Sequence, residues 1–113
     1  MEHINYDESG QFCSGHVACG GCVEALALRG IMNTVGPDAI GVVAPSCSAV
    51  ILGGHPMSSV KIPFIHGTLE SAAASASGVK RALLAKGKTE TTVLCLAGDG
   101  GTYDIGLQAL SSA

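Results

Sequence analysis

Thr92-Val93-Leu94-Cys95-Leu96-Ala97-Gly98-Asp99-Gly100-Gly101 is the stretch that decides the fold of this 113-residue chain. Residues 93–97 form an apolar run that is too short for a lone helix and is bounded by turn residues, so we expect a buried parallel strand. An open α/β sheet places its ligands at the carboxyl ends of such strands. The sequence therefore predicts a ligand site immediately after residue 97.

The Gly-Asp-Gly-Gly segment has the composition of a diphosphate and metal site. Gly98, Gly100 and Gly101 allow a ligand to approach the backbone and its N–H groups closely, at the start of an expected helix. Asp99 offers the hard carboxylate oxygen with which proteins hold Mg²⁺ beside a phosphate. An ordinary strand-to-helix turn is the alternative, since Asp and Gly are common turn residues.

The elements expected before this segment alternate in type. Residues 39–44 are a second short apolar run, which leads directly to Cys47. Residues 70–86 are expected to form a helix rich in Ala, Ser and Gly, with Thr68 as N-cap and Gly87 just past its end. An earlier helix ends at Gly36-Pro37, and its apolar residues recur at helical spacing: Val23, Leu26, Ala27, Ile31 and Val35. Alternating helices and strands predict an α/β fold with a doubly wound, mostly parallel sheet.

The small residues of the 70–86 helix suggest close packing. Ala72, Ala73, Ser75, Ala76 and Gly78 fall on one face. Such a face lets a helix approach a sheet or a cofactor closely, and packing against the sheet is the more common use. Residues 53–67 between the second strand and this helix are expected to be a loop, since they contain several glycines and prolines.

Composition excludes several classes of function. Charged residues make up only 13% of the chain and the formal net charge is −3, so there is no basic footprint for nucleic acid. The N-terminus lacks the basic and apolar regions of a signal peptide, and no apolar run has the length of a membrane span. We expect a cytoplasmic protein. Its low charge suggests that other chains or further sequence cover much of its surface.

The two ends of the chain carry separate expectations. Residues 1–12 are polar and aperiodic, which predicts an N-terminal arm before a domain spanning residues 13–113. Leu107 to Leu110 have helical spacing, and Asp104 is expected to cap that helix, but the chain stops soon afterwards without a C-cap. We therefore expect an N-terminal fragment of a longer chain.

The cysteines are the second chemical signal. A cytosolic Cys-x-x-Cys pair, here Cys19 and Cys22, more often holds metal or performs redox chemistry than forms a structural disulfide. With Cys47 it offers three thiolates, which suit an iron–sulfur cluster or tetrahedral zinc. Thioredoxin-type redox chemistry is a further alternative. His16, beside the loop, is expected to serve as a hydrogen-bonding residue.

Several motifs in fixed order resemble one family. They are Gly15-His16-x-x-Cys19-x-Gly21-Cys22, then Cys47, then Pro63-x-Ile65-His66 with the Ala-rich segment from Glu70 to Gly78, and finally residues 98–110. Together they are similar to the beta subunits of the pyruvate:ferredoxin oxidoreductase (pyruvate synthase) family. The resemblance covers about residues 13–113, and its specificity lies in combining a cysteine trio with Gly-Asp-Gly.

The resemblance implies a fold, three cofactors and a reaction. The fold is that of a thiamine diphosphate-binding domain, incomplete at its C-terminus. Asp99 takes the position of the Mg²⁺ ligand that holds the diphosphate of thiamine pyrophosphate. Cys19, Cys22 and Cys47 match three of four ligands of a [4Fe–4S] cluster. The reaction is reversible oxidative decarboxylation of pyruvate with coenzyme A to acetyl-CoA and CO₂, with electrons passing to ferredoxin.

The same resemblance implies partners and leaves some residues without a role. An alpha subunit and other subunits of the same enzyme would complete the site, so this chain alone would be inactive. The family carboxylate that activates thiamine belongs to another subunit, so Glu24 and Glu70 inherit no such role. Position 23 is usually glycine in the family and is Val23 here. Cys13 matches no ligand and is expected to be free, and Cys95 is expected in the core.

Some alternatives remain open at this stage. A non-catalytic module that holds zinc or a cluster would use the cysteine trio alone, and a cluster-free thiamine decarboxylase would leave the trio unused. Pyruvate is the first choice of substrate, with branched-chain 2-oxoacids and 2-oxoglutarate next.

Overall fold

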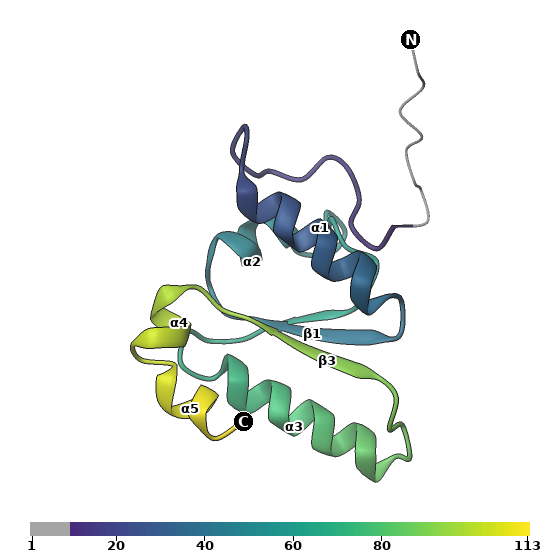
Figure 1. The fold of residues 1–113 in the computed structure, drawn as a ribbon, viewed down its shortest axis with the longest axis vertical. Helices are drawn as coiled ribbons and strands as arrows, with labels where there is room; N and C mark the ends of the chain where they lie inside the picture. The colour runs from purple at the N-terminus through teal and green to yellow at the C-terminus, as the bar shows by residue number, and fades with distance from the viewer. Residues whose placement is uncertain (1–9) are drawn as a thin grey trace.

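The structure, a computed structural model, describes residues 10–113 (Figure 1). Eight elements follow one another along the described chain: α1 (Val23–Val35), β1 (Ala39–Val43), α2 (Cys47–Leu52), β2 (Phe64–His66), α3 (Ala72–Ala85), β3 (Thr92–Leu96), α4 (Asp99–Tyr103) and α5 (Leu107–Ser111).

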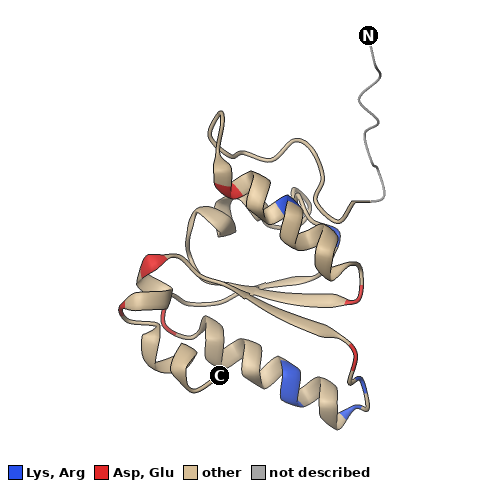
Figure 2. Ribbon diagram, in the orientation of Figure 1, with Lys and Arg blue, Asp and Glu red and all other residues tan. Residues whose placement is uncertain are grey.

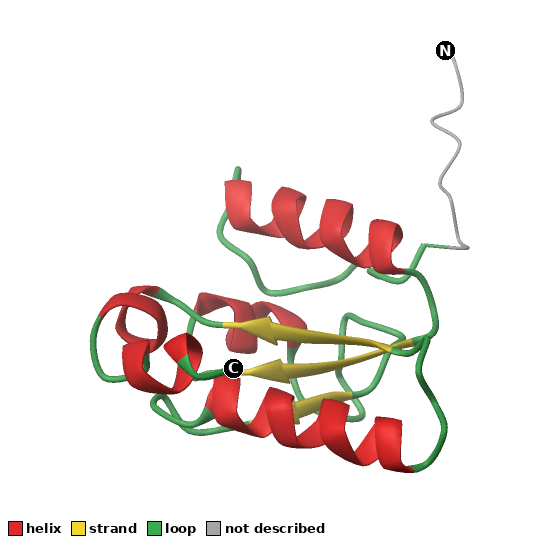
Figure 3. Cartoon of the chain, turned by 60° about the horizontal axis from the view of Figure 1, so that its bottom comes forward, coloured by secondary structure: helices red, strands yellow, loops and turns green. Residues whose placement is uncertain are grey.

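The three strands form one parallel sheet in the order β2-β1-β3. The central strand pairs Gly41 with Phe64 of β2 on one side and with Leu94 of β3 on the other. Helices α1 and α2 cover one face of this sheet and α3 covers the other (Figures 1 and 3). Helices on both faces of a parallel sheet confirm the predicted doubly wound α/β fold.

The core is divided by the sheet into two clusters. Leu28 and Met32 of α1 pack with Leu52 of α2 and Val43 of β1 on one face, and Met32, Leu52 and Val43 are completely buried. On the other face Val42 packs against small residues of α3. Neighbouring residues of β1 point to opposite faces, so a single central strand anchors both layers.

Helix α3 confirms the predicted packing role of its small residues. Ala72, Ala73 and Ala76 are buried, and Ala72 and Ala76 pack against Val42. Gly78 is exposed and lies outside this contact. At the end of the helix Gly87 has φ 75°, and the backbone N–H of Lys88 donates to the carbonyl of Leu83 at 2.9 Å. Gly87 therefore ends the helix as predicted.

The predicted caps of two helices are wrong. The N-cap of α3 is Ser71 rather than Thr68, and the hydroxyl of Thr68 lies 2.6 Å from that of Ser71. Residues 69–71 form a turn that delays the start of the helix. Asp104, expected to cap the last helix, is instead the C-cap of α4, and α5 begins after Gly106 with no side-chain cap.

Two short elements were not predicted from the sequence. Helix α2 begins after Ser46, whose side-chain oxygen accepts a hydrogen bond from the backbone N–H of Ala49. Strand β2 lies within the segment 53–67, and it pairs with β1 over three residues. Both are too short for periodicity to reveal them and are held by their neighbours.

Helix α1 is confirmed, but the apolar stripe seen in the sequence is not its buried face. Its buried residues are Ala25, Leu28 and Met32. Val23 is 77% exposed and Leu26 is 70% exposed. Thus α1 carries apolar residues on two sides, only one of which the described chain covers.

Strand β3 is parallel, as predicted, but it is not buried. Four of its five residues are half-buried and Cys95 is exposed. The prediction that Cys95 belongs to the core is therefore wrong. Strand β3 lies at an edge of the described sheet, so a face that a central strand would cover stays partly open.

Residues 10–12 at the end of the predicted arm contact the folded domain, and residues 1–9 lie outside the described part. Phe12 is 5% exposed, belongs to the core with Leu28 and forms an isolated bridge with Val60. None of the helices within residues 10–113 has the length and apolarity needed to span a membrane.

Candidate functional site

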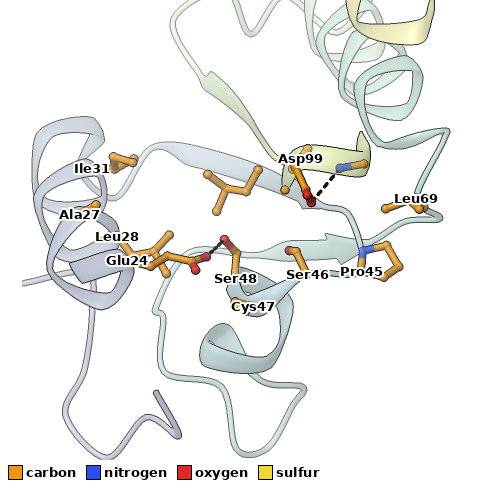
Figure 4. A pocket seen from close by; sticks show the side chains of 14 residues that line it. Glu24, Ala27, Leu28, Ile31, Pro45, Ser46, Cys47, Ser48, Leu69 and Asp99 are labelled. Carbon is orange, nitrogen blue, oxygen red and sulfur yellow. Dashed lines mark hydrogen bonds between the residues drawn. The ribbon is translucent and has the colours of Figure 1, made fainter. Parts of the chain in front are cut away.

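A cleft of about 630 Å³ opens at the carboxyl ends of β1 and β3 (Figure 4). One side is made by residues 45–48, which connect β1 to α2, and another by residues 96–100, where β3 gives way to α4. Open α/β sheets place ligands at this position, and the volume lies in the usual range for small-molecule sites. Gly98, Asp99 and Gly100, which follow the predicted strand, line this cleft.

The walls of the cleft are mainly apolar. Helix α1 contributes Ala27, Leu28 and Ile31, and Leu69 and Leu96 close the cleft from other sides. Apolar walls with a few converging polar groups are typical of sites for organic ligands and cofactors.

The Gly-Asp-Gly turn forms the wall nearest to β3. Gly98 is the extended N-cap of α4, and the exposed Asp99 is the first residue of that helix. The side chain of Asp99 folds back, so that Oδ1 accepts a hydrogen bond from the backbone N–H of Gly100 at 2.9 Å. The second carboxylate oxygen accepts no hydrogen bond within residues 10–113 and remains available to a cation.

Gly101 supports the turn from beneath instead of lining the cleft. Of the four predicted cofactor-binding residues, Gly98, Asp99 and Gly100 line the cleft, whereas Gly101 is buried under it. A Cβ atom at Gly101 would lie 3.0 Å from the Cβ of Ala97. The glycine at this position thus allows α4 to pack closely on the end of β3.

Glu24 is a residue of the cleft that sequence reasoning did not assign. It lies in the first turn of α1 and accepts a hydrogen bond from the hydroxyl of Ser48, a buried residue of α2 (Figure 4). Its place two residues after Cys22 gave no sign of this contact, because Ser48 is 24 positions away in sequence. Only the packing of α1 beside α2 brings them together.

The charged groups of the cleft are all acidic. Glu24 and Asp99 are lining residues, and no Lys, Arg or His lines the cleft in the part of the chain that the structure describes. Figure 2 shows acidic residues at the starts of α1 and α4, and basic residues farther along α1 and toward the end of α3. An anionic ligand would therefore need a cation to offset these two carboxylates.

The three predicted cluster cysteines line two different hollows. Cys47, the first residue of α2, lines the cleft. Cys19 and Cys22 line a neighbouring pocket of about 360 Å³ together with His16 and Arg29. All five cysteines are free thiols. Within residues 10–113 no three His, Cys, Asp or Glu side chains are close enough to hold a metal ion, so as placed the trio does not form a metal site.

The loop that carries Cys19 and Cys22 is fixed by local contacts. The Nδ1 atom of His16 accepts a hydrogen bond from the backbone N–H of Ala18 at 3.4 Å, and its ring lies 5.2 Å from that of Phe12. The guanidinium carbon of Arg29 lies over the ring of Phe12, 5.8 Å from its centroid. The expected hydrogen-bonding role of His16 is confirmed.

Comparison with known proteins identifies the domain. Residues 45–113 match the family model described as thiamine pyrophosphate enzyme, C-terminal TPP binding domain. This range includes the whole of α2 and α3 and the Gly-Asp-Gly turn.

The chain is also similar to subunits of two kinds of oxidoreductase. It is 46% identical over 99 residues to the pyruvate synthase subunit PorB of Methanothermobacter thermautotrophicus, covering 88% of this chain and 34% of that protein. It is 42% identical over 105 residues to the ketoisovalerate oxidoreductase subunit VorB of Pyrococcus furiosus, covering 88% of this chain and 34% of that protein. The chain therefore spans about a third of the length of these relatives.

These findings confirm the resemblance predicted from the motifs. Residues 45–48 and 96–100, which form two sides of the cleft, both lie inside the matched domain. The family match extends over more than half of the chain, and with it the chain belongs to the thiamine pyrophosphate enzymes, in the part that forms their C-terminal TPP-binding domain.

Proposed function

We propose that the cleft binds the diphosphate end of thiamine pyrophosphate, with Asp99 as a ligand of the Mg²⁺ ion that carries it. The free carboxylate oxygen of Asp99 is the kind of hard donor that Mg²⁺ takes, and Gly98 and Gly100 leave the backbone open beside it. Among residues 10–113, a diphosphate without metal would meet only Glu24 and Asp99 as charged groups of the cleft. A divalent cation reverses this repulsion, so binding depends on the metal.

The family membership and the apolar walls support the choice of cofactor. When bound, thiamine pyrophosphate supplies a site that stabilises the negative charge developing on a 2-oxoacid as it loses CO₂. The described chain supplies the binding surface: Asp99 at one end and the apolar residues of α1 along one side.

The whole protein acts as a 2-oxoacid:ferredoxin oxidoreductase. The observation that carries this assignment is the similarity, across 88% of the chain, to subunits of both a pyruvate synthase and a ketoisovalerate oxidoreductase. Pyruvate is the preferred substrate. It reacts with coenzyme A to give acetyl-CoA, CO₂, one proton and two electrons, and the electrons pass to two molecules of ferredoxin.

This activity requires partners. The chain spans about a third of its relatives' length, and the apolar stripe of α1 with Val23 and Leu26 is exposed. An alpha subunit and further subunits of the same enzyme complete the site, and the described chain alone is inactive. The five free thiols agree with a cytoplasmic location.

Cys19, Cys22 and Cys47 are assigned to a [4Fe–4S] cluster as part of the same proposal. Thiolates are the usual ligands of such clusters. The hydrogen bond between Glu24 and Ser48 supports the grouping, because it joins the start of α1, next to Cys22, to the start of α2, next to Cys47. To bind the cluster, the pocket that contains Cys19 and Cys22 and the cleft that contains Cys47 would have to come closer together. The cluster would also need a fourth ligand.

Substrate-dependent electron transfer tests the function. The intact complex that carries this chain is assayed for ferredoxin reduction with pyruvate, 2-oxoisovalerate and 2-oxoglutarate, with and without coenzyme A and thiamine pyrophosphate. We expect the highest kcat/KM with pyruvate and no reduction when either coenzyme A or thiamine pyrophosphate is omitted. A higher kcat/KM with 2-oxoisovalerate would overturn the substrate, and no reduction with any 2-oxoacid would overturn the function.

A further inference from the structure

A second hollow, of about 390 Å³, lies at the β2 edge of the sheet. Its lining residues come from the segment between α2 and β2 and from β2 itself, and all of them fall within residues 53–66. This hollow shares no lining residue with the cleft at the carboxyl ends of β1 and β3. It is therefore a separate site, which the proposed function does not use.

Hydrogen bonds and one close backbone approach fix the shape of the segment that forms this hollow. The backbone N–H of Ser59 donates to the carbonyl of Leu52 at 2.8 Å, and its buried hydroxyl donates to the carbonyl of Ile51, also at 2.8 Å. Gly53 has φ 67°, and a Cβ atom there would lie 2.8 Å from the carbonyl oxygen of Met57. The segment is thus fastened to the end of α2, so the hollow exists before any ligand binds.

The floor of the hollow is apolar. Val60 and Ile62 are buried members of the core, and the half-buried Phe64 packs against them. Phe64 and His66 are two positions apart on β2, so they point to the same face of the sheet. An apolar floor with a few polar groups around it suits the organic part of a small ligand.

The ionisable groups of this hollow are all basic. Lys61, His55 and His66 line it, and within residues 10–113 no Asp or Glu does. The cleft has the opposite character, since its charged groups are Glu24 and Asp99. A lysine ammonium group and an imidazole N–H both donate hydrogen bonds to oxyanions. The β2 hollow therefore favours an anion without the help of a metal ion.

We propose that the β2 hollow binds a phosphorylated small organic molecule, whose phosphate contacts His55, Lys61 and His66 and whose organic part lies on the apolar floor. A phosphate monoester has three strongly accepting oxygens, which matches three basic side chains. The exposed Gly54, which lacks a side chain, lets the ligand approach the backbone closely. The volume is in the range of small-molecule sites, which favours such a ligand over a protein segment. This inference does not rest on the proposed function.

The test measures binding of ADP to the intact complex by calorimetry in magnesium-free buffer. ADP has both a phosphate group and an organic ring system, and without Mg²⁺ the acidic cleft should repel it. Three further probes separate the parts of the proposal. Adenosine lacks the phosphate, inorganic phosphate lacks the organic part, and polyglutamate represents an acidic protein segment.

We expect Lys61→Met and His55→Gln each to weaken ADP binding by about fivefold, because each removes a donor to the phosphate. Lys61→Arg keeps the positive charge and should retain most of the affinity. Lys88→Met is the matched control, since Lys88 is exposed and does not line the hollow, and it should bind ADP as the unaltered complex does. Adenosine and inorganic phosphate should each bind at least about tenfold more weakly than ADP.

Four results would overturn the inference. They are no binding of ADP, equal affinity for ADP in all variants, inorganic phosphate binding as tightly as ADP, and binding of polyglutamate in place of ADP with a loss after Lys61→Met. The last would assign the hollow to an acidic protein partner. Thermal unfolding of each complex identifies misfolding, and the comparison of Lys61→Arg with Lys61→Met isolates the charge from the length of the side chain. Magnesium-dependent binding of thiamine pyrophosphate is measured separately, so a failure here leaves the proposed function standing.

Discussion

Gly101 and Gly106 are two glycines whose missing side chains allow close packing around α4. The backbone N–H of Gly106 donates to the carbonyl of Gly100 at 3.2 Å, which closes the turn between α4 and α5. A Cβ atom at Gly106 would lie 2.1 Å from the carbonyl oxygen of Gly101. This carbonyl oxygen belongs to the backbone, so it cannot move aside as the end of a side chain could.

Gly106→Ala should therefore destabilise the protein. Overpacking of this kind costs about 1–3 kcal/mol of unfolding free energy, because the backbone of α4 must shift. The urea midpoint of unfolding measures the change. Gly78→Ala is the matched control: Gly78 lies inside α3 with nothing within 4 Å of its added Cβ, so alanine should raise stability by about 0.5–1 kcal/mol. If Gly106→Ala were as stable as the unaltered protein, the close packing of the two glycines would be wrong.

Cys95 makes a second prediction at the scale of the residue. It is exposed overall, but it lines a shallow groove with Val93 and Leu110, and this partial burial raises the pKa of its thiol. Cys95→Ala should change the unfolding free energy at pH 7 by less than about 0.5 kcal/mol, the usual limit for a surface residue. A loss of several kcal/mol would return Cys95 to the core.

The pKa direction adds a pH dependence with a definite sign. The unfolded thiol ionises around its ordinary pKa of 9.0, while the folded thiol keeps its proton to a higher pH because burial raises its pKa. The unaltered protein should therefore lose stability as the pH rises from the ordinary pKa through the folded pKa. Cys95→Ala should lose less over the same interval, as measured by urea midpoints at several pH values.

At the scale of single residues the sequence could predict chemistry better than position. The position of Asp99 in the cleft could be predicted, because Asp99 follows β3 closely and open α/β sheets place their ligands at the carboxyl ends of the strands. The position of Glu24 in the cleft could not be predicted, since it depends on the contact with Ser48, and that contact exists only after α1 packs beside α2. Cys95 was misplaced because an apolar strand looks the same at the centre and at the edge of a sheet.

At the scale of elements, length decided what could be predicted. The helices α1 and α3, of 13 and 14 residues, and the five-residue strands β1 and β3 carry enough residues for a period or a bounded run. Helix α2 and strand β2 have six and three residues and are stabilised by neighbouring elements. Burial of α1 could not be predicted either, because apolar residues lie on two of its sides.

The cysteines near the starts of α1 and α2 allow a test of the proposed cluster. In the intact complex, Cys19→Ser, Cys22→Ser and Cys47→Ser should each lower iron and acid-labile sulfide, because a serine hydroxyl is a poor ligand for the iron of a cluster. Cys13→Ser and Cys95→Ser are matched controls and should retain both. An equal loss of iron from Cys13→Ser would mean that the ligands are assigned wrongly.

At the scale of the molecule, the parallel sheet gathers residues that are far apart in sequence. Glu24, Ser48 and Asp99 come from three helices and meet at one end of the sheet, where β1 and β3 finish. The other end carries the hydrogen bonds of Lys80 to the carbonyls of Thr89 and Thr91, each at 2.9 Å, which secure the return from α3 to β3. The cleft thus lies at one end of the strands, and the hydrogen bonds of Lys80 lie at the other end.

Whether Asp99 holds the metal-bound diphosphate is tested most directly by the affinity for thiamine pyrophosphate after Asp99→Asn, measured by calorimetry on the intact complex at several Mg²⁺ concentrations. Loss of the charged ligand should cost about 1.5–3 kcal/mol, roughly ten- to a hundredfold in affinity, and more Mg²⁺ should be needed. Asp104→Asn should bind as the unaltered complex does, since Asp104 is exposed and does not line the cleft. Unchanged affinity after Asp99→Asn, or an equal loss after Asp104→Asn, would show that Asp99 is not the ligand of the metal.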